Sequence, residues 1–148
     1  NYGSLKKFTV KEMKMKVDNY QNWAKELFGG ACYAACISWI SNWMSDKISA
    51  IDITRDILAG VEKGYIEDDG FVSEPHLFYN YCLRKKIAKD VRILPYEPQP
   101  FNQIVCWKWK DKTHFVVMRD DKVVFDPAGD SNTVKYGKID SIREFVAW

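Results

Sequence analysis

The chain has 148 residues, of which 47% are hydrophobic and 15% are aromatic, which predicts one folded domain with a buried core rather than a disordered chain. Its formal net charge of +2 is too small to indicate a nucleic-acid partner or a charged membrane surface. The uncharged stretch 27–45 contains glycine, serine and asparagine, which favours a helix buried inside a domain over a membrane span. We therefore expect a soluble domain, 1–148, with no membrane span and no nucleic-acid partner.

The first 17 residues are basic and predict an N-terminal arm. Five lysines face a single glutamate, Glu12; they are Lys6, Lys7, Lys11, Lys14 and Lys16. We interpret them as a solvated face, with a docking arm for an acidic partner as the less favoured alternative. The location stays open between a secreted protein and a part of a larger bacterial polypeptide.

Residues 18–90 predict a helical half. Helices are expected over 19–28, 32–45, 52–63 and 75–86, because each segment has residues typical of helix ends at its boundaries. The expected start residues are Asp18, Asp52, Ser73 and Pro75, and the expected stop residues are Gly29, Gly30 and Gly64. The helix over 32–45 is the most apolar of the four, so we expect it at the centre of the domain.

Residues 91–148 predict an antiparallel sheet. The β-rich segments are 91–94, 103–109, 114–119 and 122–126, with 133–136 as a further candidate. Asp120 and Asp121 predict a tight hairpin connection between the third and fourth of these. Residues 139–146 suggest a short closing helix. Helices followed by an antiparallel sheet indicate an α+β fold.

The cysteines are too few for a disulfide scaffold of this length. They are Cys32, Cys36, Cys82 and Cys106. Cys32 and Cys36 would lie one helical turn apart, in poor geometry for a bridge, so we expect all four to be reduced. A zinc site made of Cys32, Cys36, His76 and His114 lacks paired short ligand spacings, and we therefore predict no metal.

Three residues together suggest a thiol nucleophile with its base and an orienting acid. Cys32 follows Gly29-Gly30 at a helix start, where the helix dipole favours the thiolate. His114 opens one strand and Asp126 closes the next, and antiparallel neighbours place these two ends side by side. Taken singly, Cys32 could be a core cysteine and Asp126 part of a plain turn, but the combination favours catalysis. Of the two histidines, His76 suits the surface.

The segments that carry these residues resemble a known family. Cys-x-x-x-Cys opening the helix at 32, His-Phe-Val-Val from 114 and Asp-Pro-Ala-Gly from 126 are similar to the papain-like cysteine peptidases. The likeness is greatest to the branch that processes double-glycine leaders of bacteriocins. The resemblance implies a nucleophile helix packed on a C-terminal antiparallel sheet, with Cys32 as nucleophile, His114 as base and Asp126 as orienting acid. It also implies a thiol protease that hydrolyses a peptide or protein substrate through an acyl-enzyme, with no cofactor.

The chain departs from the pattern of that family at two positions. Such enzymes usually carry glutamine six residues before the nucleophile, where it donates to the oxyanion, and here that position is Glu26. Gln21 or Asn22 could serve instead. Tyr33 stands where the branch usually has glycine, and we expect it to narrow the cleft. The alternatives are therefore a weakened or inactive domain that binds peptides, or another thiol acyl-transfer enzyme of the transglutaminase or deamidase type.

Overall fold

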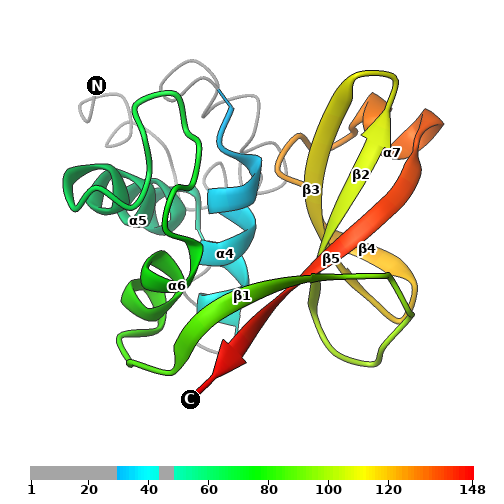
Figure 1. Ribbon diagram of the computed structural model, residues 1–148. Helices are drawn as coiled ribbons and strands as arrows, with labels where there is room; N and C mark the ends of the chain where they lie inside the picture. The colour runs from blue at the N-terminus through cyan, green and yellow to red at the C-terminus, as the bar shows by residue number, and fades with distance from the viewer. Residues whose placement is uncertain (1–29, 44–48) are drawn as a thin grey trace.

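In the computed structural model of this chain, residues 30–43 and 49–148 are described. Three helices come first: α4 (Cys32–Asn42), α5 (Ala50–Glu62) and α6 (Pro75–Leu83). They gather on one side of a sheet formed by the second half of the chain (Figure 1). Within the described ranges, no helix has both the length and the apolar character needed to cross a membrane.

The sheet has five antiparallel strands. They are β1 (Ala88–Leu94), β2 (Gln103–Trp109), β3 (Lys112–Arg119), β4 (Lys122–Phe125) and β5 (Lys138–Ala147). Their order across the sheet is β1-β5-β2-β3-β4. A short helix, α7 (Asn132–Tyr136), lies between β4 and β5 in the chain. Helices on one side of an antiparallel sheet confirm the predicted α+β class.

The last two predicted elements were wrong: the predicted strand is a helix, and the predicted helix is a strand. Residues 133–136 form helix α7 instead of a strand, because the Ser131 side chain caps it by accepting the Thr133 N–H. Residues 139–146 form strand β5 instead of a helix. Ile142 belongs to a core cluster on the far face of the sheet, whereas the Phe145 ring stacks on Tyr79 of α6. These apolar residues therefore serve opposite faces of a strand and not one side of a helix.

The boundaries of the other elements differ from expectation by a few residues. Helix α5 is capped by Ser49, whose side chain accepts the Asp52 N–H at 3.1 Å, and not by Asp52 itself. Ser73 does not cap α6, which ends early because Arg84 adopts a left-handed conformation. Strand β1 begins at Ala88, so the sheet half starts before residue 91. The predicted basic arm, 1–17, and the helix over 19–28 lie outside the described residues.

Helix α4 is the centre of the larger core cluster. It packs against α5, α6 and β3, and its residues 34–39 are buried. The Trp39 ring stacks on Phe125 at the end of β4, with ring centroids 5.3 Å apart. A second, smaller cluster covers the other face of the sheet; its buried members are Val105, Val116, Met118 and Ile142. The first residue of α4 is therefore held at a fixed place beside the sheet.

A buried carboxylate ties α4 to α5. Asp56 of α5 is 5% exposed and accepts hydrogen bonds from Ser38 Oγ at 2.7 Å and Asn42 Nδ2 at 3.1 Å. Burial raises the pKa of Asp56 above its ordinary value, although these hydrogen bonds oppose the shift. A polar contact inside an apolar interface fixes how the two helices are aligned, because each group needs its partner.

We expect Asp56→Ala to destabilise the fold, because it leaves the Ser38 hydroxyl without its buried acceptor. The expected loss is roughly 1–3 kcal/mol of unfolding free energy, measured by urea denaturation. Glu62→Ala is the control, since Glu62 is an exposed carboxylate at the end of α5, and it should change the stability by less than about 0.5 kcal/mol. Equal losses in both variants would show that the contact to α4 contributes nothing.

Candidate active site

Cys32 is the first residue of α4 and lies at the surface end of a buried helix. Gly30 precedes it with φ of 111°, a conformation that favours glycine, so the chain can turn sharply into the helix. Ala31 offers no side chain to cap the helix, and the first turn holds no acidic residue. Cys32 is partly exposed, whereas Cys36, Cys82 and Cys106 are buried. It is therefore the accessible thiol among the four.

His114 of β3 and Asp126 meet as expected from the hairpin. His114 Nε2 lies 2.7 Å from Asp126 Oδ1, and because an ionised carboxylate only accepts, the imidazole donates this hydrogen bond. The two residues are 6% and 8% exposed. The connection between β3 and β4 is tight, with Asp120 and Asp121 both at positive φ. The hairpin thus brings two polar residues twelve positions apart into direct contact.

The turn after Asp126 holds its carboxylate in place. Asp126 Oδ1 also accepts the Ala128 N–H at 2.9 Å, and Oδ2 accepts the Ser131 N–H at 3.3 Å. The Gly129 N–H donates to the Asp126 carbonyl, which closes the turn. The segment is therefore both a turn and a cradle for the carboxylate. The part that the Ser131 N–H takes in this turn was not predicted.

His114 is coupled to both of the other residues. Burial lowers the pKa of His114, but hydrogen bonds with Asp126 and Cys32, together with their negative charges, outweigh burial and raise the pKa to about 9. The imidazolium therefore stabilises the fold fully below pH 6.5, and this contribution is lost as the pH rises through about 9.

Two cavities open on either side of Cys32. One, of about 530 Å³, is lined by Cys32, Thr113 and His114 of this centre together with Trp109 and the residues that lead into α7. The other, of about 690 Å³, is lined by Cys32, Tyr33 and residues of both halves of the chain, but not by His114. Such concave surfaces on both sides of a nucleophile can hold the two parts of an extended substrate.

The remaining candidates do not join this centre. Burial raises the pKa of the Cys36, Cys82 and Cys106 thiols, as suits core residues. His76 lies in α6 and lines a different cavity, with Trp148. Within residues 30–43 and 49–148, no group of three or more potential ligands could hold a metal ion. The three candidates for the oxyanion position, Glu26, Gln21 and Asn22, lie outside the described residues.

An aromatic contact and a cation beside Cys32 were not predicted. The Tyr33 ring stacks on the Phe115 ring of β3, with centroids 4.5 Å apart. The Arg143 guanidinium lies 5.2 Å from the centroid of the Phe115 ring. The Tyr33 hydroxyl is buried without a hydrogen-bond partner, and burial raises its pKa. Tyr33 thus forms a wall of the larger cavity. The sequence predicted that Tyr33 narrows the cleft.

The family of the chain is established by comparison with family models. The chain belongs to the family described as "Protein of unknown function, DUF261", whose model matches residues 13–147. No curated protein and no solved structure matches the chain. The chemistry of this family therefore has to be argued from the site itself.

The pairing of His114 with Asp126 can be tested by proton NMR. The chain has two histidines, so a His76→Gln variant assigns both imidazole resonances. We expect His114 to titrate near pH 9, and its pKa to fall well below 9 in Asp126→Asn, because burial then opposes the charged ring with one anion fewer. An unchanged midpoint in Asp126→Asn would contradict the coupling.

Proposed function

We propose that this chain is a cysteine peptidase that hydrolyses peptide bonds through Cys32, His114 and Asp126. The observation that carries the proposal is the buried His114–Asp126 contact of 2.7 Å, whose His114 ring shares a cavity wall with the Cys32 thiol at the start of α4 and is coupled to it electrostatically. A nucleophile, a base and an acid that orients the base are the recurring arrangement of acyl-transfer enzymes. The packing of α4 on an antiparallel sheet supports a papain-like arrangement, as does the sequence resemblance.

The proposed reaction proceeds in two halves and needs no cofactor. The Cys32 thiolate attacks the scissile carbonyl carbon, and the resulting oxyanion faces the N–H groups at the start of α4. When the C–N bond breaks, His114 gives its proton to the leaving amine, and a thioester remains on Cys32. Water then attacks the thioester while His114 takes a proton from that water. The C–S bond breaks, the acid product leaves and the Cys32 thiolate is restored. Asp126 keeps the ring oriented throughout and stabilises its charged form.

Two other functions are compatible with the same three residues. The first is a domain that binds peptides with weak or no hydrolysis. Glu26 favours it, because the papain-like peptidases usually carry glutamine at this position and an ionised carboxylate would repel the oxyanion. The other alternative is transfer of the acyl group to an amine, or deamidation, on the same thioester. The mass of the product separates these reactions from hydrolysis.

Thiol reactivity tests the nucleophile directly. We expect iodoacetamide to label Cys32 at least about tenfold faster than the three buried cysteines near neutral pH, because Cys32 is accessible and is paired with the His114 imidazolium. Peptide mapping by mass spectrometry measures the site. Cys32→Ser should abolish peptide hydrolysis with little loss of stability. Cys36→Ala is the control: it should lower stability through a small cavity and leave labelling of Cys32 intact. Hydrolysis that survives Cys32→Ser would refute the proposal.

Glu26→Gln separates an active peptidase from a peptide-binding domain. An amide can donate a hydrogen bond where a carboxylate only accepts. If Glu26 occupies the oxyanion position, hydrolysis above pH 6 should rise on the order of tenfold or more in Glu26→Gln. The measurement is kcat on a peptide substrate from pH 5 to 9. No change at any pH would move the donor role to Gln21 or Asn22, with Gln21→Ala and Asn22→Ala as the next variants.

A further inference from the structure

The larger cavity beside Cys32 is a groove between the two halves of the chain. Its helical wall begins at Cys32 and continues along the loop before α6, and its sheet wall comes from β1, β3 and β5. The helical wall includes Tyr33, Asp69, Gly70, Phe71 and Val72, and the sheet wall includes Val91, Ile93, Thr113, Phe115 and Arg143. A chain bound along this groove would have its reacting carbon at the Cys32 end.

The rim of the groove exposes apolar side chains. Phe71 is 62% exposed on one wall and Ile93 is 66% exposed on the other. Val91 and Ile93 belong to the same strand two residues apart, so they face the groove together. Large apolar side chains facing each other across a concave surface indicate a site that another molecule covers.

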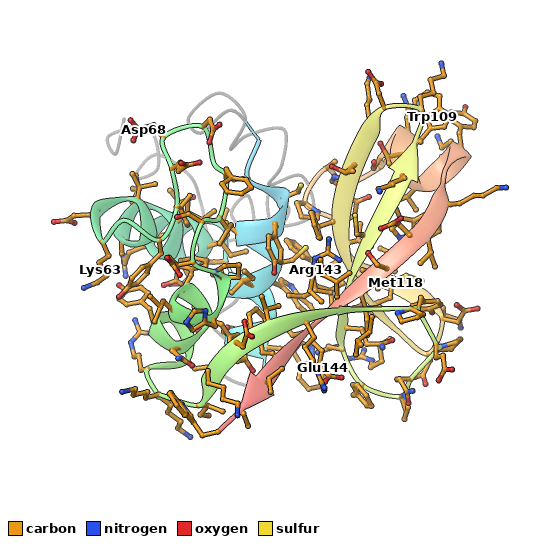
Figure 2. The ribbon with its side chains drawn as sticks, viewed as in Figure 1. Lys63, Asp68, Trp109, Met118, Arg143 and Glu144 are labelled. Atoms are coloured by element: carbon orange, nitrogen blue, oxygen red, sulfur yellow. The ribbon has the colours of Figure 1, made fainter. Side chains whose placement is uncertain are left out.

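Arg143 adds a cation to this mainly apolar groove. It comes from β5, opposite Ile93 of β1 in the register of the sheet, and its side chain lies between α4 and the sheet (Figure 2). Its guanidinium is held against the Phe115 ring, while Nη1 donates to Ser141 Oγ at 2.8 Å and to the Ile142 carbonyl at 3.3 Å. These contacts fix the direction of the side chain.

Two nitrogens of the Arg143 guanidinium are available to bind a ligand. Among the described residues, Nε and Nη2 of Arg143 have no hydrogen-bond partner, and they are not among the fully buried unpartnered atoms, so they reach solvent. Glu144 pairs with Arg92 and Asp140 pairs with Lys108, although Asp140 also feels the charge of Arg143 and is linked to it through the Ser141 hydroxyl. Among the described residues no carboxylate forms a direct ion pair with Arg143, so its half-buried guanidinium is suited to bind one from outside, because its planar fork matches carboxylate geometry.

The place of His114 tells which part of a substrate enters the groove. His114 lines the smaller cavity and not the groove. Because His114 must reach the leaving nitrogen to protonate it, the amine part of the substrate lies on the side of the smaller cavity. The acyl part, which stays on Cys32, then extends along the groove toward Phe115 and Arg143.

We propose that this groove selects substrates that carry an acidic side chain in the acyl part, and that Arg143 is the residue that determines this specificity. The proposal rests on the proposed function, since it uses Cys32 as the reacting atom. The apolar walls hold the body of the chain and the guanidinium binds the carboxylate. Among the described residues, Asp69 is the one carboxylate that lines the groove; it is exposed, and its Oδ1 accepts the Phe71 N–H, so solvent screens its charge. Arg143 also lines a cavity of about 330 Å³ that does not reach Cys32.

Matched affinity labels test the proposal without requiring turnover. The probes are acetyl-Xaa-Gly and acetyl-Gly-Xaa chloromethyl ketones in which Xaa is Glu or Gln, so that each pair differs only in charge. The readout is the second-order rate of Cys32 alkylation by mass spectrometry. For at least one pair we expect the wild-type protein to react roughly tenfold faster with the Glu label, the order expected for one charge-assisted contact in a half-buried site.

Two variants of Arg143 and one control separate specificity from folding. In Arg143→Gln the ratio of Glu to Gln rates should fall to about one, and in Arg143→Lys part of the preference should remain. Lys89→Gln removes an exposed positive charge from β1 without breaking an ion pair of the described residues, and it should leave the ratio unchanged. Iodoacetamide labelling of Cys32 at the wild-type rate shows that each variant keeps an intact site.

The outcomes distinguish failure of the inference from failure of the proposed function. A ratio near one in the wild-type protein for both pairs, with Cys32 labelled rapidly, overturns the acidic specificity and leaves the peptidase proposal standing. A preference that persists in Arg143→Gln overturns the role of Arg143. If Cys32 reacts no faster than the buried cysteines with any label, the proposed function fails and this inference fails with it.

Discussion

The site depends on a buried contact between a carboxylate and an imidazole. Such a pair is costly to remove from water, and it is tolerated only when its remaining acceptors and donors are satisfied. Here the Asp126 carboxylate receives the Ala128 and Ser131 N–H groups in addition to the His114 ring. The His114 ring is in turn coupled electrostatically to Cys32. Each group in the chain of three is thus held by the next, and the thiol lies at the open end.

The position of the Cys32 thiol relative to His114 depends on two neighbouring residues that contact different parts of the fold. Phe125 and Asp126 are consecutive at the end of β4. The Phe125 ring stacks on Trp39 of α4, while the Asp126 carboxylate binds His114. The same two residues therefore join α4 to the sheet and orient the His114 ring. The contact of Asp56 with Ser38 fixes α4 from its other side, against α5. A shift of α4 would move Cys32 away from a histidine that cannot follow it.

Local signals in the sequence were enough for the parts that are close together in the chain. Strand 103–109 has the predicted bounds, and the meeting of His114 with Asp126 follows from a hairpin whose turn residues are visible in the sequence. The exchange of helix and strand at 133–146 shows the limit. β5 is a central strand because β1 and β2 pair with it, and its apolar residues serve two cores, which periodicity alone does not reveal. A helix over 139–146 also gives no place for Arg143, which in strand β5 lies opposite Ile93 of β1 and Ile104 of β2 and reaches the Phe115 ring of β3.

The two cavities beside Cys32 differ in chemistry, and this difference gives the site a direction. Among the described residues, the groove is mainly apolar, with Arg143 and Asp69 as its charged side chains, and Thr113 lines both cavities. Polar side chains predominate in the smaller cavity near His114; they include Lys112, Asp130, Ser131, Asn132 and Thr133. Any acyl transfer through Cys32 would use the groove for the part that stays and the smaller cavity for the part that leaves. Hydrolysis and transfer to an amine differ in what enters the smaller cavity after the first amine has gone. A space lined by the hydroxyls of Thr113, Ser131 and Thr133 and by one carboxylate, Asp130, is suited to hold and orient water. The polar lining therefore favours hydrolysis over amine transfer as the proposed second step.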